Sequence, residues 1–164
     1  MRKRVNLLVC GNGGHQHEMD LLYSYMLNST RFVDASPFIL MTTSHHSRFN
    51  HLELINIMEV RSKESKISTL FLTPIAIIVN LFQLFRVLIR YKVCGVLSTG
   101  PGVAIIPIII CKLFRIKIVH IESMCRFYNI SLSGRVIRLF ADKFIVQNES
   151  LARKCKTFIY GGRL

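Results

Sequence analysis

Short apolar runs alternate with longer stretches of helical periodicity along the whole chain. The apolar runs predict strands over residues 5–10, 38–42, 55–60, 93–98, 116–122 and 143–147, with a last strand or exit segment within 156–162. The periodic stretches predict helices over 14–27, 67–91, 102–114 and 132–141, and a short helix within 148–155. Strands that are apolar throughout are typical of a parallel sheet covered on both faces. The pattern therefore predicts a Rossmann-like α/β fold in which residues 1–164 form a single domain.

One predicted helix is apolar enough to raise the question of a membrane. The stretch from Ile67 to Phe85 is 19 residues long without a charge, which is close to transmembrane length. Pro74 within it indicates a helix start or a kink. A helix that crossed a bilayer here would pull neighbouring strands apart, so we expect one side to pack on the sheet and the other to touch lipid; a fully buried helix is the alternative. Basic residues around the helix would hold it to an anionic leaflet: Lys63, Lys66, Arg86, Arg90 and Lys92.

The charge balance indicates an anionic partner. The sequence has 22 lysines and arginines against 9 acidic residues, a net charge of +13. These cations are scattered rather than interleaved with aromatic residues, which argues against a nucleic-acid partner. Because the chain is also unusually apolar, an anionic membrane surface or a pyrophosphate substrate fits better.

The cysteines and the remaining histidines give little sign of a metal or disulfide framework. Five cysteines are widely spaced with no C-x-x-C pair, and no signal peptide is visible, so we expect a reducing, cytoplasmic location. His45, His46 and His51 are interpreted as part of a solvated loop. No metal and no cofactor are expected.

Polar segments follow the predicted strands, where ligands of parallel sheets bind. The first is the loop Gly11, Asn12, Gly13 and Gly14, whose spacing matches neither a dinucleotide fingerprint nor a Walker loop but whose bare amides favour an anion. His15 follows in the first helical turn and is a candidate general base. The alternative is a tight turn that His15 merely caps.

Two further loops are candidates for the same edge of the sheet. One offers Ser98, Thr99, Gly100 and Gly102 around Pro101 at a helix start. The other follows the fifth strand and offers Glu122, Ser123, Arg126 and Ser131. Arg126 could clamp a phosphate, or it could simply pair with Glu122. For Asp142 and Gln147 we expect structural roles.

Six ordered segments carry a family resemblance: "GNGGHQHEM", "STGPG", "IESMCR", "SLSGR", "ADKFIVQ" and the terminal "YGGRL". In order and spacing the chain resembles the bacterial exopolysaccharide and capsule glycosyltransferase subunits. It is also similar to the membrane-anchoring subunit of the eukaryotic split N-acetylglucosaminyltransferase of asparagine-linked glycosylation. The likeness covers residues 5–164. The eukaryotic subunit begins with a transmembrane helix that this sequence lacks, which favours the bacterial branch.

The resemblance implies the N-terminal half of a GT-B glycosyltransferase. A separate partner chain would be the C-terminal half and would bind the UDP-sugar, while this chain would bind a polyprenyl-pyrophosphate-linked sugar at the cytoplasmic membrane face. The glycine loop and His15 would face the acceptor, and Glu18 matches an acidic position of the family. Glu18 and Glu122 are rival bases or could orient the imidazole. A non-catalytic membrane adaptor is the alternative function. Residues 158–164 are expected to contribute to partner docking.

Overall fold

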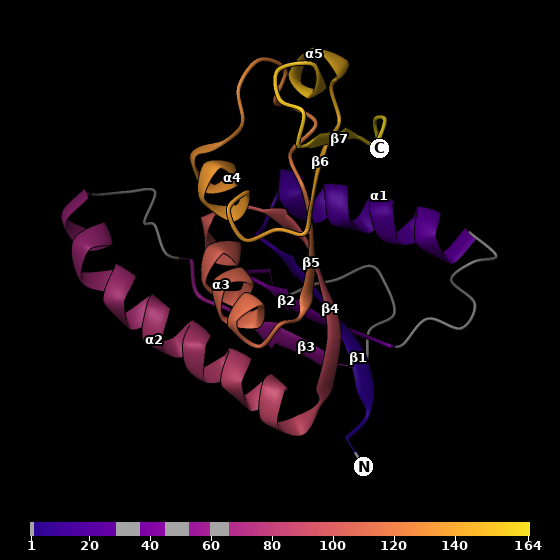
Figure 1. Cartoon of the computed structure of the whole chain (residues 1–164). Helices are drawn as coiled ribbons and strands as arrows, with labels where there is room; N and C mark the ends of the chain where they lie inside the picture. The colour runs from indigo at the N-terminus through magenta and orange to yellow at the C-terminus, as the bar shows by residue number, and fades with distance from the viewer. Residues whose placement is uncertain (1, 29–36, 45–52, 60–65) are drawn as a thin grey trace.

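The computed structural model describes residues 2–28, 37–44, 53–59 and 66–164, and it places seven strands in one parallel sheet (Figure 1). The strand order is β3-β2-β1-β4-β5-β6-β7. The predicted loop histidines His45, His46 and His51 lie outside the described residues, as does Lys63. The strands are β1 Arg4–Cys10, β2 Phe38–Thr42, β3 Glu53–Asn56, β4 Lys92–Gly100, β5 Lys117–Ile121, β6 Lys143–Val146 and β7 Phe158–Tyr160.

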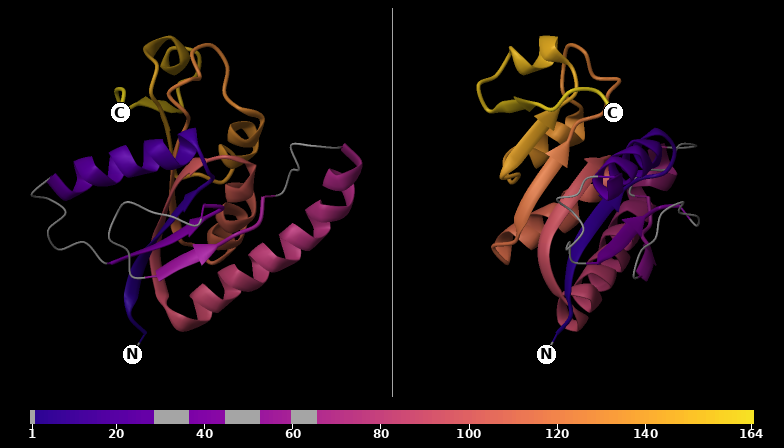
Figure 2. Two further views of the ribbon diagram at one scale, coloured as in Figure 1. Left: turned by 180° about the vertical axis from the view of Figure 1, so that it is seen from behind. Right: turned by 90° about the vertical axis from the view of Figure 1, so that its right-hand side faces the viewer.

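Helices cover both faces of this sheet, as the sequence predicts. They are α1 Gly14–Asn28, α2 Lys66–Arg90, α3 Ile105–Leu113, α4 Leu132–Ile137 and α5 Glu149–Ala152, with a 3-10 turn at Gly102–Ala104 before α3. Successive residues of β1 point to opposite faces, so Leu8 and Leu7 belong to two different apolar clusters. Met19 of α1 joins the cluster around Leu8, whereas Leu84 of α2 and Ile108 of α3 join the cluster around Leu7. Thus α1 covers one face and α2 to α5 cover the other (Figure 2).

Several element boundaries differ from the sequence-based prediction. The third strand ends at Asn56 rather than at residue 60, because its neighbour β2 ends at Thr42. The chain then leaves the sheet, and the Asn80 side chain of α2 bonds both the amide and the carbonyl of Met58 at 2.8 and 2.9 Å. The helix over 132–141 is shorter than predicted and gives way to tight turns after Ile137.

Two prolines, Pro74 and Pro107, are accommodated in helices. Helix α2 runs from Lys66 to Arg90 with Pro74 inside it, so the helix does not begin at Pro74. Pro107 is the third residue of α3, where a missing N–H leaves no intrahelical hydrogen bond unmade.

Helix α2 buries one side and exposes an apolar stripe on the other. Asn80, Leu84 and Val87 are buried. The exposed stripe consists of Ile75, Ile78, Phe82, Phe85 and Ile89. By length and composition the segment Thr73–Arg90 could cross a membrane, but its packing into the apolar cluster of the sheet is that of a helix lying along the fold. The alternative that this helix is fully buried is therefore wrong.

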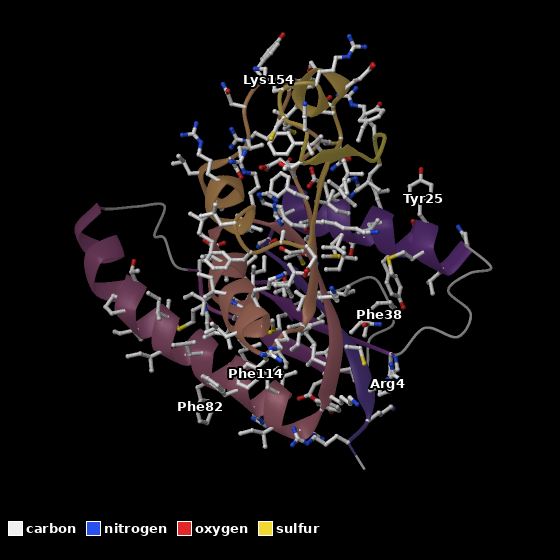
Figure 3. All side chains as sticks on the ribbon, in the orientation of Figure 1. Arg4, Tyr25, Phe38, Phe82, Phe114 and Lys154 are labelled. Atoms are coloured by element: carbon white, nitrogen blue, oxygen red, sulfur yellow. The ribbon has the colours of Figure 1, made fainter. Side chains whose placement is uncertain are left out.

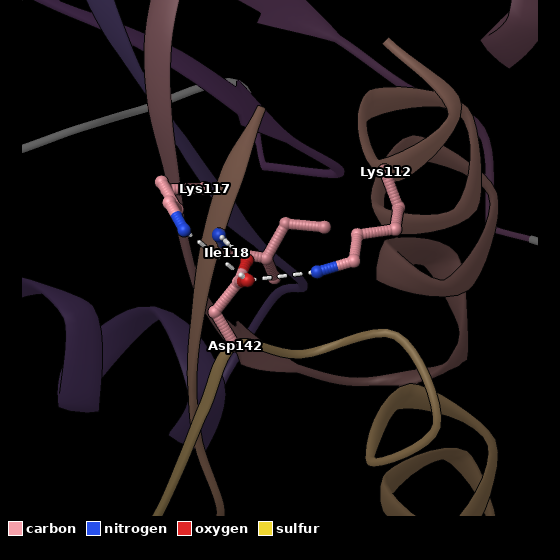
Figure 4. Close-up of polar contacts among 4 residues, drawn as sticks. All are labelled: Lys112, Lys117, Ile118 and Asp142. Carbon is pink, nitrogen blue, oxygen red and sulfur yellow. Dashed lines mark hydrogen bonds and ion pairs between the residues drawn. The ribbon is translucent and has the colours of Figure 1, made fainter. Parts of the chain in front are cut away.

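Asp142 has the structural role that the sequence indicates. Its carboxylate accepts a hydrogen bond from the Ile118 amide at 2.8 Å and one from Lys112 Nζ at 2.8 Å, with Lys117 Nζ at 3.8 Å (Figure 4). The hydrogen bond from Lys112 is the largest contribution that lowers the pKa of Asp142 below its usual value. This carboxylate ties the start of β5 to α3 at the edge opposite the glycine loops.

Candidate functional site

The two glycine loops that the sequence singles out lie directly against each other at the carboxyl ends of β1 and β4. The Gly11 amide donates to the Gly100 carbonyl at 2.9 Å. A Cβ added at Gly11 would lie 2.3 Å from Cδ of Pro101, so only glycine allows this approach. Gly13 and Gly100 have φ values of +71° and +87°, a region that other residues rarely adopt. Glycines therefore allow β1 to turn into α1 while its loop packs on the loop after β4.

His15 is fixed in the first turn of α1 by two hydrogen bonds to Thr99. Its Nδ1 lies 2.8 Å from the Thr99 carbonyl oxygen, and Thr99 Oγ1 donates to the His15 carbonyl, also at 2.8 Å. Because a carbonyl oxygen only accepts, Nδ1 of the neutral ring carries the proton and Nε2 has the free lone pair. The ring is half-buried, beside the exposed Asn12, Gly13 and Gly14. This geometry presents Nε2 as a proton acceptor.

A second imidazole, His120 of β5, lies near Gly100 as well. A Cβ at Gly100 would lie 3.5 Å from Cε1 of His15 and 3.8 Å from Cε1 of His120. His120 is 2% exposed, and its Nδ1 has no hydrogen-bond partner among the described residues. Burial lowers the pKa of His120 to about 3, with a smaller contribution from His15. His120 is not among the site residues that the sequence predicts, because a histidine within an apolar strand run gives no sign of which side chains it will contact.

Glu18 lies one turn after His15 and connects α1 to the segment that follows β5. Its Oε1 accepts from Ser123 Oγ at 2.7 Å and from the Met124 amide at 2.9 Å. The residue is 2% exposed, and its Oε2 has no hydrogen-bond partner within the described chain. Glu18 therefore holds the segment after β5 against α1, with one carboxylate oxygen still able to accept a hydrogen bond.

Glu122 is fully engaged inside the protein. It accepts from the Ser123 amide at 3.2 Å through Oε1, and from the Ser131 amide and hydroxyl at 3.0 and 3.1 Å through Oε2. Ser131 in turn caps α4 by accepting from the Gly134 amide at 2.9 Å, and a Cβ at Gly134 would lie 2.1 Å from Oε2 of Glu122. This arrangement gives the Glu122 carboxylate the function of fixing the start of α4, and it disfavours a role as base.

The other predicted ligand-binding residues divide into buried supports and exposed groups. Ser98 and Thr99 are buried, and Ser98 Oγ accepts from the Gly100 amide at 3.0 Å, so these hydroxyls act by shaping the loop. Arg126 is exposed, and the pairing with Glu122 is not among the ion pairs of the described residues. Gly102 begins the 3-10 turn before α3.

Side chains from the turn between β6 and α5 support the segment after β5. Gln147 donates to the Glu122 carbonyl at 3.1 Å, and Asn148 donates to the Met124 and Arg126 carbonyls at 2.8 Å each. The expected structural role of Gln147 is confirmed. Within the described part of the chain, no three His, Cys, Asp or Glu side chains form a group that could hold a metal ion.

A family model described as "Oligosaccharide biosynthesis protein Alg14 like" matches residues 6–164. The chain belongs to this Alg14-like family. A relative in the family is "UDP-N-acetylglucosamine transferase subunit ALG14" of Mus musculus, 29% identical over 182 residues that cover 96% of this chain and 82% of the relative. The corresponding subunit of Schizosaccharomyces pombe is 28% identical over 177 residues, covering 95% of this chain and 81% of the relative.

Solved structures show the same fold at low sequence identity. MurG of Acinetobacter baumannii aligns with a TM-score of 0.62 and 14% identity, covering 99% of this chain and 44% of MurG. UDP-N-acetylglucosamine 2-epimerase of Rickettsia bellii aligns with a TM-score of 0.64 and 16% identity, covering 99% of this chain and 45% of the epimerase. The Alg14-like chain therefore spans less than half the length of these proteins. The alignments confirm the predicted Rossmann-like fold of GT-B type.

Proposed function

We propose that this Alg14-like chain is the acceptor-binding half of a two-component glycosyltransferase. A partner chain supplies the half that binds a UDP-sugar, and the sugar is transferred to a polyprenyl-pyrophosphate-linked sugar in cell-surface polysaccharide synthesis. The family relatives are named as subunits of a UDP-N-acetylglucosamine transferase, which supports a need for a second chain. The acceptor sugar occupies the edge of the sheet formed by the two glycine loops.

The observation that carries the proposal is the hydrogen bond from His15 Nδ1 to the Thr99 carbonyl, at 2.8 Å. It leaves Nε2 free to take a proton from the acceptor hydroxyl as that oxygen attacks the sugar carbon bonded to UDP. The bond from the sugar to the UDP oxygen breaks as the new glycosidic bond forms, and the proton moves to Nε2. Glu18 supports this step by holding Ser123 and the Met124 amide against α1.

The chain works at the cytoplasmic face of the membrane in this proposal. The apolar stripe of α2 faces the lipid, flanked by the basic residues Arg86, Arg90 and Lys92. Apolar area and positive charge act together as two weak anchors. This placement brings a lipid-linked acceptor to the chain without a helix crossing the bilayer.

The test is turnover in the chain reconstituted with its partner, comparing His15→Gln with His17→Gln. His17 is exposed on the same helix and serves as the matched control. A positioned base contributes about 100- to 10,000-fold in rate, so we expect His15→Gln to lose at least 100-fold in kcat while the complex and acceptor binding persist. Turnover of His15→Gln within a few-fold of the control, with the pair intact, would indicate the adaptor function instead.

A further inference from the structure

A basic cavity lies apart from the glycine loops, between α4, α5, β7 and the end of the segment after β5. Its volume is about 390 Å³. Three of its lining residues are the cations Arg135, Arg138 and Lys154, and none of the described residues that line it is acidic. Tyr128 and Phe158 contribute aromatic walls. Three cations without an anion around one cavity make it strongly electropositive.

Two of these cations are held in place by neutral groups. The Arg138 guanidinium lies 5.7 Å from the centre of the Phe158 ring, and Lys154 Nζ lies 5.8 Å from that of Tyr128. Lys154 also donates to the Tyr128 carbonyl. These contacts order the cations and leave their charge uncompensated, which prepares them for an anion from outside.

One acidic residue of an adjoining cavity is already engaged in other contacts. Asp142 lines an adjoining cavity that shares Arg138, but its carboxylate is bonded to Lys112 and to the Ile118 amide at 2.8 Å each. Arg153, the residue before Lys154, is paired with Glu149. The described residues that line the cavity include no carboxylate.

Helix α4 and the turn that follows it supply Arg135 and Arg138 and also expose an apolar row. Leu132 and Leu139 are 78% and 73% exposed, and Val136 lies between them at i+4 spacing from Leu132. Helix α4 packs beside α3, and α3 beside α2. Figure 3 shows Phe114, which follows α3, and Phe82 of the α2 stripe, and both side chains are exposed. Each of these three neighbouring helices thus has exposed apolar side chains within it or at its end.

We propose that this cavity binds the phosphate or diphosphate group of a membrane lipid, with the apolar row of α4 against its hydrocarbon chain. An arginine guanidinium can donate two parallel hydrogen bonds to the oxygens of one phosphate group, and Lys154 adds a point charge. The inference rests on the membrane-associated part of the proposed function.

Vesicle flotation of the full chain tests the site. The wild type, Arg135→Gln/Arg138→Gln and the charge-matched control Lys3→Gln/Lys143→Gln are compared on vesicles of phosphatidylcholine with phosphatidylglycerol, and with polyprenyl diphosphate at equal charge. Lys3 and Lys143 are exposed and belong to the other end of the sheet. A cation near an anionic surface contributes roughly fivefold in affinity, so the arginine pair should lose about 25-fold and the control less than threefold.

The outcomes separate the two lipid sources and the two proposals. If the arginine double variant binds both vesicle types more weakly, the cavity binds a general phospholipid headgroup. If it binds only the polyprenyl diphosphate vesicles more weakly, the cavity binds the acceptor lipid. Equal losses in both double variants mean diffuse charge and overturn the site, as does wild-type binding by the arginine variant. Thermal unfolding confirms that the variants fold. Turnover with the partner on a detergent-dispersed acceptor reports on the proposed function independently of vesicle binding.

Discussion

The buried imidazole of His120 makes the stability of this fold depend on pH in a way that one substitution should remove. The side chain is 2% exposed, its ring centre lies 5.1 Å from that of Phe144, and its Nδ1 lacks a partner among the described residues. We expect His120→Leu to fold, with a free energy of unfolding at pH 7 that is at most about 1 kcal/mol below that of the wild type. The loss should be small because a buried polar atom without a partner already costs about 1–3 kcal/mol in the wild type.

The sign and size of the effect follow from the lowered pKa. Burial lowers the pKa of His120 in the folded chain to about 3, whereas an unfolded histidine titrates near 6.5. As the pH falls below 6.5 the unfolded chain binds a proton that the folded chain does not, so folding stability is lost. Between pH 7 and pH 4.5 this linkage is worth about 2.5 kcal/mol for one group.

The measurement is the free energy of unfolding from urea titrations across that pH range, for the wild type, His120→Leu and His17→Gln. His17 is exposed, so its substitution should leave the pH dependence nearly unchanged. The wild type should lose about 2.5 kcal/mol more than His120→Leu on going to pH 4.5. Parallel curves for wild type and His120→Leu would refute the assignment of a buried, neutral imidazole.

Two further predictions concern the surface of the chain. The double variant Ile78→Gln/Phe82→Gln should bind anionic vesicles at least tenfold more weakly than the wild type, because both side chains are more than 60% exposed on the α2 stripe and bury apolar area in lipid. Leu27→Gln on α1 is the control in the vesicle flotation assay. Equal binding by the wild type, the double variant and the control would argue against membrane contact by α2. Truncation after Tyr160 should weaken co-purification with the partner chain several-fold and lower the melting temperature only slightly, since it removes two backbone-donated hydrogen bonds of 3.1 Å, from the Gly161 amide to the Val146 carbonyl and from the Leu164 amide to Gln147. Full association of the truncated chain would contradict docking through this end.

The sequence by itself determined the parallel α/β fold and the edge at which the site lies. Continuous apolar strands and helical periodicity are local signals, and parallel strands bring all their carboxyl ends to one edge. The glycines of the first loop and His15 could be found in the same way, since the conformational needs of a tight strand-to-helix turn are written in the residues of the turn. The apolar character of α2 was equally visible, but which side of the helix packs on the sheet was not.

Only the tertiary structure decided what each polar side chain touches. Glu18 and Glu122 are both acidic residues of the predicted site, yet one connects α1 to Ser123 and the other fixes Ser131 at the start of α4. His120 and the cavity cations Arg135 and Arg138 gave no local signal, because their environment is built from strands and loops far apart in the sequence. Hydrogen bonding and burial depend on such long-range contacts, whereas backbone preference depends on near neighbours, and this difference separates what the chain's pattern predicts from what its packing decides.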